Sequence, residues 1–303
     1  MSAGTVFRFA PSPNGELHLG HAYSALVGFA MARRAGGRFL VRIEDIDIGR
    51  CREEFVAQMF ADLAWLGIGW EEPVLRQSEH VETYRAAARR LEEMGLLYPC
   101  FATRAEIAEA AQARPQGLDP DGAPLYPGIH KRLSSSEIEE RRGRGDPFAL
   151  RIDMDRALET ARRLLAGRAL TFTELDLEGR PTTIEARPER WGDAVIVRKD
   201  VPASYHLAVT VDDARQGVTH VTRGRDLLAA TDLHRLLQVL LGLEEPVYHH
   251  HRLITDGEGR KLAKSVRDTS LRSLRSDGVT PGQVRTLLGV RDTGGAMPSP
   301  NLP

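Results

Sequence analysis

The first part of the chain constrains the fold more than any other segment. Val6 to Ala10 predict a short strand, which a turn of two prolines, an asparagine and a glycine follows at Pro11 to Gly15. Apolar residues at helical spacing then run from Gly20 to Gly37. A second strand at Phe39 to Ile43 leads directly into the acidic segment Glu44 to Asp47. This strand–helix–strand unit predicts an α/β fold with a parallel sheet.

The rest of the chain alternates helices and strands around a break in composition. Helices are expected at 52–66, 80–94 and 227–241, and apolar strand-like runs at 194–199, 205–211 and 218–222. Between Ala111 and Gly128 lie four prolines and three glycines, which indicate an insertion. We therefore expect a catalytic domain in two halves (1–95 and 192–242), an inserted mixed α/β module (96–191), a C-terminal segment (243–292) and a disordered tail (293–303).

Composition narrows the class of protein. The 303 residues carry 41 Lys plus Arg against 42 Asp plus Glu, which argues against indiscriminate nucleic-acid coating. From Arg252 onward, however, nine basic residues face five acidic ones, so a local RNA-facing surface stays open. Two cysteines and the absence of an apolar leader predict a cytoplasmic protein. The longest apolar run, Ala22 to Ala32, is shorter than the roughly 20 residues of a membrane span, so no membrane role is expected.

Two short motifs carry candidate nucleotide chemistry. His18-Leu19-Gly20-His21 stands where a loop enters a helix, and there amide groups and two imidazoles can donate to phosphate oxygens. Lys261-Leu262-Ala263-Lys264-Ser265 follows a polar, glycine-rich turn, and its lysines can neutralise a triphosphate. Taken alone, each motif also fits a solvated surface segment. Their pairing favours an ATP site formed by His18, Gly20, His21, Lys261 and Lys264.

These motifs resemble the HIGH and KMSKS signatures of the class I aminoacyl-tRNA synthetases, in the same order and at a similarly wide separation. Arg8 to Gly15 and Arg42 to Asp47 resemble the glutamyl branch of that class in particular. The resemblance implies a Rossmann-like catalytic domain that binds ATP with Mg²⁺, and catalytic roles for His18, His21 and Lys264. No proton-abstracting residue is expected, because the attacking α-carboxylate is already ionised.

The resemblance also implies a glutamate site built from both halves of the catalytic domain. Its expected residues are Arg8, Phe9, Ala10, Pro11, Ser12, Glu44, Tyr205 and Arg223. A guanidinium suits the γ-carboxylate and a carboxylate suits the ammonium group, so Arg8 and Arg223 are the γ-carboxylate candidates.

Only 38 residues follow Ser265, where conventional glutamyl enzymes continue into an anticodon-binding domain. This pattern resembles the shortened members of the branch, which transfer glutamate to the queuosine base in the anticodon stem-loop of tRNA(Asp). We therefore expect this chain to transfer glutamate to queuosine and to act as a monomer. The alternatives are a truncated enzyme that charges the tRNA 3′ end and a non-catalytic tRNA-binding protein that retains the glutamate pocket. A small-substrate nucleotidylyltransferase with a related H-x-G-H motif would leave Arg8, Glu44 and Arg223 unexplained.

The inserted module contains an incomplete metal-binding pattern. Members of the family often carry zinc there on a Cys-x-Cys pair and a Tyr-x-x-x-Cys segment. This chain has Cys100, Tyr126 and His130 at three of those positions and Ala102 at the fourth, so bound zinc is not expected. We do not expect the His249-His250-His251 run to bind metal either, because successive side chains of a strand point to opposite faces.

Overall fold

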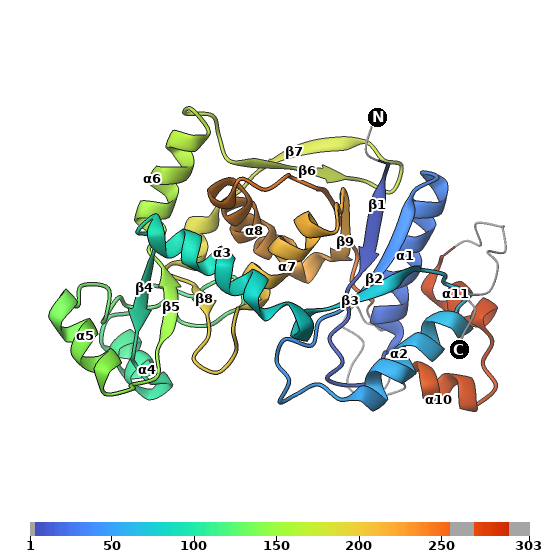
Figure 1. The fold of residues 1–303 in the computed structure, drawn as a ribbon. Helices are drawn as coiled ribbons and strands as arrows, with labels where there is room; N and C mark the ends of the chain where they lie inside the picture. The colour runs from blue at the N-terminus through green and yellow to red at the C-terminus, as the bar shows by residue number, and fades with distance from the viewer. Residues whose placement is uncertain (1–3, 255–269, 291–303) are drawn as a thin grey trace.

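The computed structural model describes residues 4–254 and 270–290. Its main feature is a seven-stranded sheet with the strand order β3-β2-β1-β9-β10-β6-β7, in which β7 alone is antiparallel to its neighbour (Figure 1). In chain order the strands are β1 (Val6–Phe9), β2 (Arg38–Ile43), β3 (Glu71–Arg76), β6 (Thr171–Leu175), β7 (Pro181–Glu185), β9 (His220–Gly224) and β10 (Val247–His251). The predicted α/β fold with a parallel sheet is confirmed.

Helices cover both faces of this sheet, and further helices pack outside it. They are α1 (Leu19–Arg34), α2 (Glu53–Trp65), α3 (Val81–Glu93), α4 (Arg104–Ala113), α5 (Ser135–Gly143), α6 (Met154–Leu164), α7 (Tyr205–Arg215), α8 (Leu228–Leu241), α10 (Leu271–Ser276) and α11 (Pro281–Leu288). Figure 1 shows α1 on one side of β1, and α7 and α8 on the other. No helix among the described residues combines the length and the apolar character that crossing a membrane requires.

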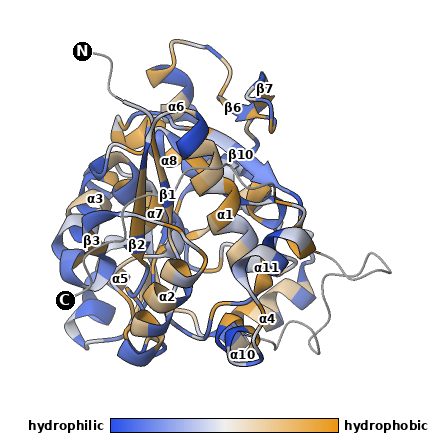
Figure 2. Ribbon diagram, turned by 90° about the vertical axis from the view of Figure 1, so that its right-hand side faces the viewer, coloured by the Kyte–Doolittle hydropathy of each residue, from blue (hydrophilic) through white to orange (hydrophobic). Residues whose placement is uncertain are grey.

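The alternation of side chains along β1 divides the apolar core from the polar site. Phe7 and Phe9 pack with α1 residues in one buried apolar cluster. Arg8, between them, points to the opposite face and contacts Asp213 of α7. Figure 2 shows the hydrophobic colouring on β1, β2 and α1 at the centre of the molecule and hydrophilic colouring on the outer helix α3.

A second, smaller sheet lies away from the main one. It has the order β4-β5-β8, with β4 (Leu97–Cys100) and β8 (Val195–Val197) each antiparallel to β5 (Ala149–Ile152). The β6–β7 hairpin lies within the 96–191 range in sequence but joins the main sheet beside β10. The division of the chain into domains by residue number stays a prediction.

One expected element was wrong. Residues 205–211 form the first part of helix α7, not a strand. The side chain of Ser204 accepts a hydrogen bond from the backbone N–H of Leu207 and caps the helix. Because α7 is buried over most of its surface, its sequence has the continuous apolar run that a buried strand also shows.

Candidate functional site

A pocket of about 850 Å³ opens where β1, β2 and β9 end and α1 begins. Such crevices at the carboxyl ends of parallel strands are the usual ligand sites of open α/β sheets. Its walls include the predicted glutamate residues Arg8, Phe9, Ala10, Pro11, Ser12, Glu44, Tyr205 and Arg223, and the predicted ATP residues His18, Gly20 and His21. The structure therefore brings eleven predicted residues to one cavity. Lys261 and Lys264 lie outside the described residues.

Helix α1 begins at the pocket with both imidazoles fixed by backbone amides. Nδ1 of His18 accepts from the N–H of Gly20 at 3.0 Å, and Nδ1 of His21 accepts from the N–H of His18 at 3.2 Å. The two rings stack with their centroids 3.8 Å apart. Because each Nδ1 is an acceptor, each neutral ring carries its proton on Nε2.

Two further features suit this helix start to a phosphate group. Burial, helped by the nearby His18, lowers the pKa of His21 to about 3, so at neutral pH its ring is an uncharged donor. A Cβ atom on Gly20 would lie 2.9 Å from Cε1 of His18. Glycine at this position therefore keeps the His18 ring in place.

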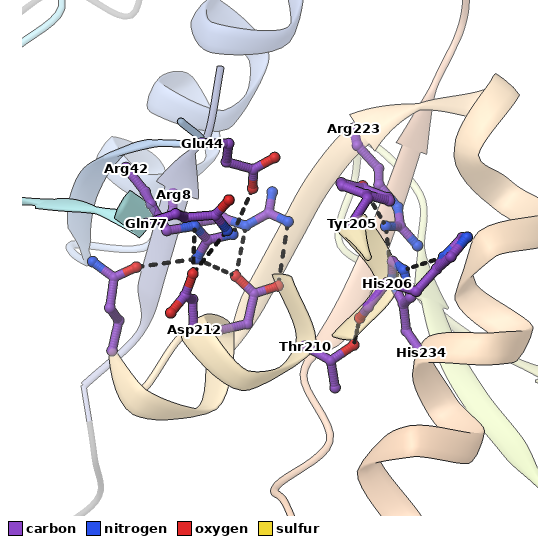
Figure 3. Close-up of polar contacts among 12 residues, drawn as sticks. Arg8, Arg42, Glu44, Gln77, Tyr205, His206, Thr210, Asp212, Arg223 and His234 are labelled. Carbon is purple, nitrogen blue, oxygen red and sulfur yellow. Dashed lines mark hydrogen bonds and ion pairs between the residues drawn. The ribbon is translucent and has the colours of Figure 1, made fainter. Parts of the chain in front are cut away.

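A buried ionic cluster lies on one side of the pocket (Figure 3). Asp213 accepts from Nε and Nη2 of Arg8 at 3.0 and 3.3 Å, and from Nη1 of Arg42 at 2.7 Å. Nη2 of Arg42 also donates to Oε1 of Glu44 at 3.1 Å. Burial alone would raise the pKa of Asp213, but the two guanidinium groups outweigh burial and lower it. Arg8 thus already has a bidentate carboxylate partner within the protein.

Glu44 presents a buried carboxylate to the same pocket. Its side chain is only 7% exposed. Burial raises its pKa, and the positive charges of Arg42 and Arg8 oppose this shift only in part. A ligand ammonium group beside Glu44 would favour its ionised form.

Arg223 has a different environment on the opposite side of the pocket (Figure 3). It is 4% exposed, and its hydrogen-bond partners among the described residues are all neutral groups. They are Nε2 of His250 at 3.2 Å, Nδ1 of His234 at 3.1 Å, the hydroxyl of Tyr205 at 3.4 Å and Oγ1 of Thr231 at 2.6 Å. No carboxylate of the described residues lies within 4.0 Å of its nitrogen atoms. A buried guanidinium that none of these carboxylates contacts directly favours an anionic ligand.

Similarity to known proteins identifies the family of this chain. Residues 5–294 match the family model of the class I tRNA synthetase (E and Q) catalytic domain. This chain belongs to the class I tRNA synthetases. Curated relatives named glutamyl-Q tRNA(Asp) synthetase include one from Rhodobacter capsulatus, 47% identical over 94% of this chain and 100% of its own length. Another, from Symbiobacterium thermophilum, is 42% identical over 91% of this chain and 83% of its own length. The predicted resemblance to the shortened members of the glutamyl branch is confirmed.

Solved structures show the same fold. A glutamate-tRNA synthetase from Elizabethkingia anophelis matches this synthetase with a TM-score of 0.69 and 26% identity, over 88% of this chain. The match covers 54% of that protein, so this chain spans about half the length of the solved relative. Membership of the class I synthetases implies an amino acid, ATP with Mg²⁺ and a tRNA as partners.

The incomplete zinc pattern forms a small buried cluster in the synthetase. Sγ of Cys100 donates to the Tyr126 hydroxyl at 3.3 Å, and that hydroxyl accepts from the N–H of His130 at 3.0 Å. Nδ1 of His130 accepts from the backbone amides of Phe101 and Ala102 at 3.1 and 3.0 Å. Backbone amides thus already occupy Nδ1 of His130 as a hydrogen-bond acceptor. Within residues 4–254 and 270–290, no group of three His, Cys, Asp or Glu side chains could hold a metal ion.

Several residues that shape the site were missed by the sequence analysis. Asp213 holds Arg8 and Arg42, whereas His234, His250 and Thr231 hold Arg223. A signal existed for Asp213, because two adjacent acids in an apolar run need buried partners. Nothing in the local sequence pairs His250 with Arg223, which comes from a different strand.

Proposed function

We propose that this synthetase activates L-glutamate with ATP and transfers the glutamyl group to the queuosine base at the wobble position of tRNA(Asp). The observation that carries the choice of glutamate is Arg223, a buried cation in the pocket wall whose hydrogen-bond partners among the described residues are neutral. The names of relatives at 40–47% identity support the tRNA part of the proposal.

Glutamate recognition follows from the charges on the two sides of the pocket. The γ-carboxylate would bind Arg223 and the Tyr205 hydroxyl, which keeps its proton because burial raises its pKa. Glu44, on the opposite side, would bind the ammonium group. Glutamine would place its amide N–H₂ against the N–H donors of Arg223, which disfavours it. Of the two γ-carboxylate candidates, Arg223 is the stronger, because Asp213 already neutralises Arg8.

Activation would need positioning and charge stabilisation more than proton transfer. An oxygen of the α-carboxylate attacks the α-phosphorus of ATP, the new P–O bond forms, and the bond to the departing pyrophosphate breaks. His18 and His21 would donate from Nε2 to phosphate oxygens, and Gly20 leaves space for the His18 ring that a Cβ would take. Lys261, Lys264 and Mg²⁺ would neutralise the pyrophosphate.

Transfer would complete the reaction. A hydroxyl of the queuosine cyclopentenediol attacks the carbonyl carbon of glutamyl-adenylate, an ester forms, and AMP leaves with the electron pair of the broken mixed-anhydride bond. The hydroxyl proton passes to the released AMP or to solvent.

A second candidate acceptor is the tRNA 3′ end. A relative from a Methylobacterium species, 39% identical over 93% of this chain, is named glutamate–tRNA ligase 2, and this chain covers 59% of it. Both candidates share the glutamate pocket, so only the site of esterification separates them. Action as a monomer in the cytoplasm stays a prediction from the sequence.

Labelled glutamate and ATP, supplied with queuosine-containing and queuosine-free tRNA(Asp), test the proposal. We expect label only on the modified tRNA, and nuclease digestion should map it to the wobble nucleotide. Label on the terminal adenosine would contradict the proposed acceptor. tRNA binding without glutamate-dependent pyrophosphate exchange would instead indicate a non-catalytic binding protein.

A further inference from the structure

The β6–β7 hairpin reaches the glutamate pocket through one chain of hydrogen bonds. Glu174 of β6 accepts from the backbone N–H of His250 with Oε1 and contacts Nδ1 of the same residue with Oε2, both at 2.7 Å. On the other side of the ring, Nε of Arg223 donates to Nε2 of His250 at 3.2 Å. We propose that Glu174 is a positioning residue that holds Arg223 in its carboxylate-binding orientation through His250. This inference rests on the proposed glutamate site.

The hydrogen bonds define one tautomer of His250. Because Nε2 accepts from Arg223, and Oγ1 of Thr231 lies 2.9 Å from the same nitrogen, the proton of the neutral ring is on Nδ1. Nδ1–H then donates to Glu174. Burial lowers the pKa of His250 despite the adjacent carboxylate, so the ring stays uncharged beside Arg223. A protonated ring would carry N–H donors on both sides and would repel the guanidinium.

The carboxylate is better suited to this position than an uncharged amide. Both donors of His250, the backbone N–H and Nδ1–H, meet an oxygen of Glu174. A glutamine has one oxygen for these two donors, so its N–H₂ group would face one of them. The ring can relieve that clash by moving its proton to Nε2, which then points an N–H at the Nε–H of Arg223. Replacing one oxygen of Glu174 therefore disturbs Arg223 indirectly, because it moves the proton of His250 from Nδ1 to Nε2.

The test compares Glu174→Gln with Glu185→Gln, which removes the same charge from the exposed end of β7 in the same hairpin. In glutamate-dependent ATP–pyrophosphate exchange we expect Glu174→Gln to raise the KM for glutamate by about ten- to hundredfold, the range for a hydrogen bond to a charged group. The KM for ATP and the thermal midpoint should stay close to the wild-type values. Glu185→Gln should behave as wild type.

A spectroscopic measurement separates positioning from a general structural role. In the substrate-free protein, the ¹⁵N chemical shifts of His250 should show the proton on Nδ1 in the wild type and on Nε2 in Glu174→Gln. An unchanged tautomer together with an unchanged KM for glutamate would overturn the proposal, as would equal rises in the KM values for glutamate and ATP. If the wild type shows no glutamate-dependent exchange, the proposed function fails, while the tautomer measurement still decides whether Glu174 controls His250.

Discussion

Replacing Arg223 by glutamine should remove the main counter-charge for the γ-carboxylate of glutamate. Arg223 is 4% exposed, so little water could replace the lost interaction. Its neutral partners, among them His234 and His250, cannot supply a positive charge, because burial lowers the pKa of both rings. In the variant, the γ-carboxylate of the substrate would therefore lack a positively charged partner on this side of the pocket.

The expected magnitude follows from the burial of this group. Removing one member of a buried ion pair costs about 3–5 kcal/mol. At about 1.4 kcal/mol per factor of ten, kcat/KM for glutamate should fall by about a hundred- to several thousandfold. Glutamine carries no charge on its side chain, so its kcat/KM should change much less. The preference for glutamate over glutamine should shrink by a similar factor.

Pyrophosphate exchange at varied glutamate and glutamine concentrations measures both quantities. Arg225→Gln is the matched control, because Arg225 is exposed two positions along the chain and is absent from the pocket wall. Circular dichroism and thermal unfolding should show that both variants fold. A loss of less than about tenfold in kcat/KM for glutamate would refute the reasoning, because it would mean that the carboxylate binds elsewhere.

Three further predictions concern stability. In Gly28→Ala, the new Cβ would lie 2.6 Å from Oγ1 of Thr222 and should push α1 away from β9, which lowers the free energy of unfolding in a urea titration by about 1–3 kcal/mol. Adding Thr222→Ala to this variant should restore part of the lost stability, and no recovery would refute the clash. Burial lowers the pKa of His206 to about 4, whereas the unfolded chain takes up that proton near pH 6.5. The free energy of unfolding should therefore fall as the pH drops from about 6.5 to 4, by up to about 1.4 kcal/mol per pH unit from this group. His206→Asn should reduce this slope, and an equal slope in both proteins would contradict the assignment. Dialysis against a metal chelator should leave the thermal midpoint unchanged, and a lower midpoint after dialysis would indicate a bound metal. Lys199→Ala, by contrast, removes the donor to the carbonyl of Phe101 at 2.8 Å and should lower the free energy of unfolding by about 1–2 kcal/mol.

The fold could be predicted where local patterns and chain order agree. The first strand, α1 and β2 follow from turn residues, helical periodicity and an apolar strand within about forty residues. Helix α7 was mispredicted because a short apolar run is the same for a buried helix and a buried strand. Only the packing of α7 between α3 and α8 decides its conformation.

The sequence predicted which residues form the candidate site, but it did not predict the hydrogen bonds and ion pairs among them. Arg8 and Arg223 were equal candidates for the γ-carboxylate, since residue type gives both the same charge. The tertiary structure distinguishes them, because it places Asp213 beside Arg8, whereas the partners of Arg223 within the described part of the chain are neutral.

The sequence by itself determined the class of fold, the loop-to-helix nucleotide motif and the residue types that face a charged amino acid. Each of these depends on neighbours in the chain or on a motif whose spacing is visible. The tertiary structure alone decided which charges are neutralised, which nitrogen of His18, His21 and His250 carries the proton, and which strand supports Arg223. These properties depend on distances between residues as far apart as Arg8 and Asp213, or Glu174 and His250, and on burial, which strengthens their interactions.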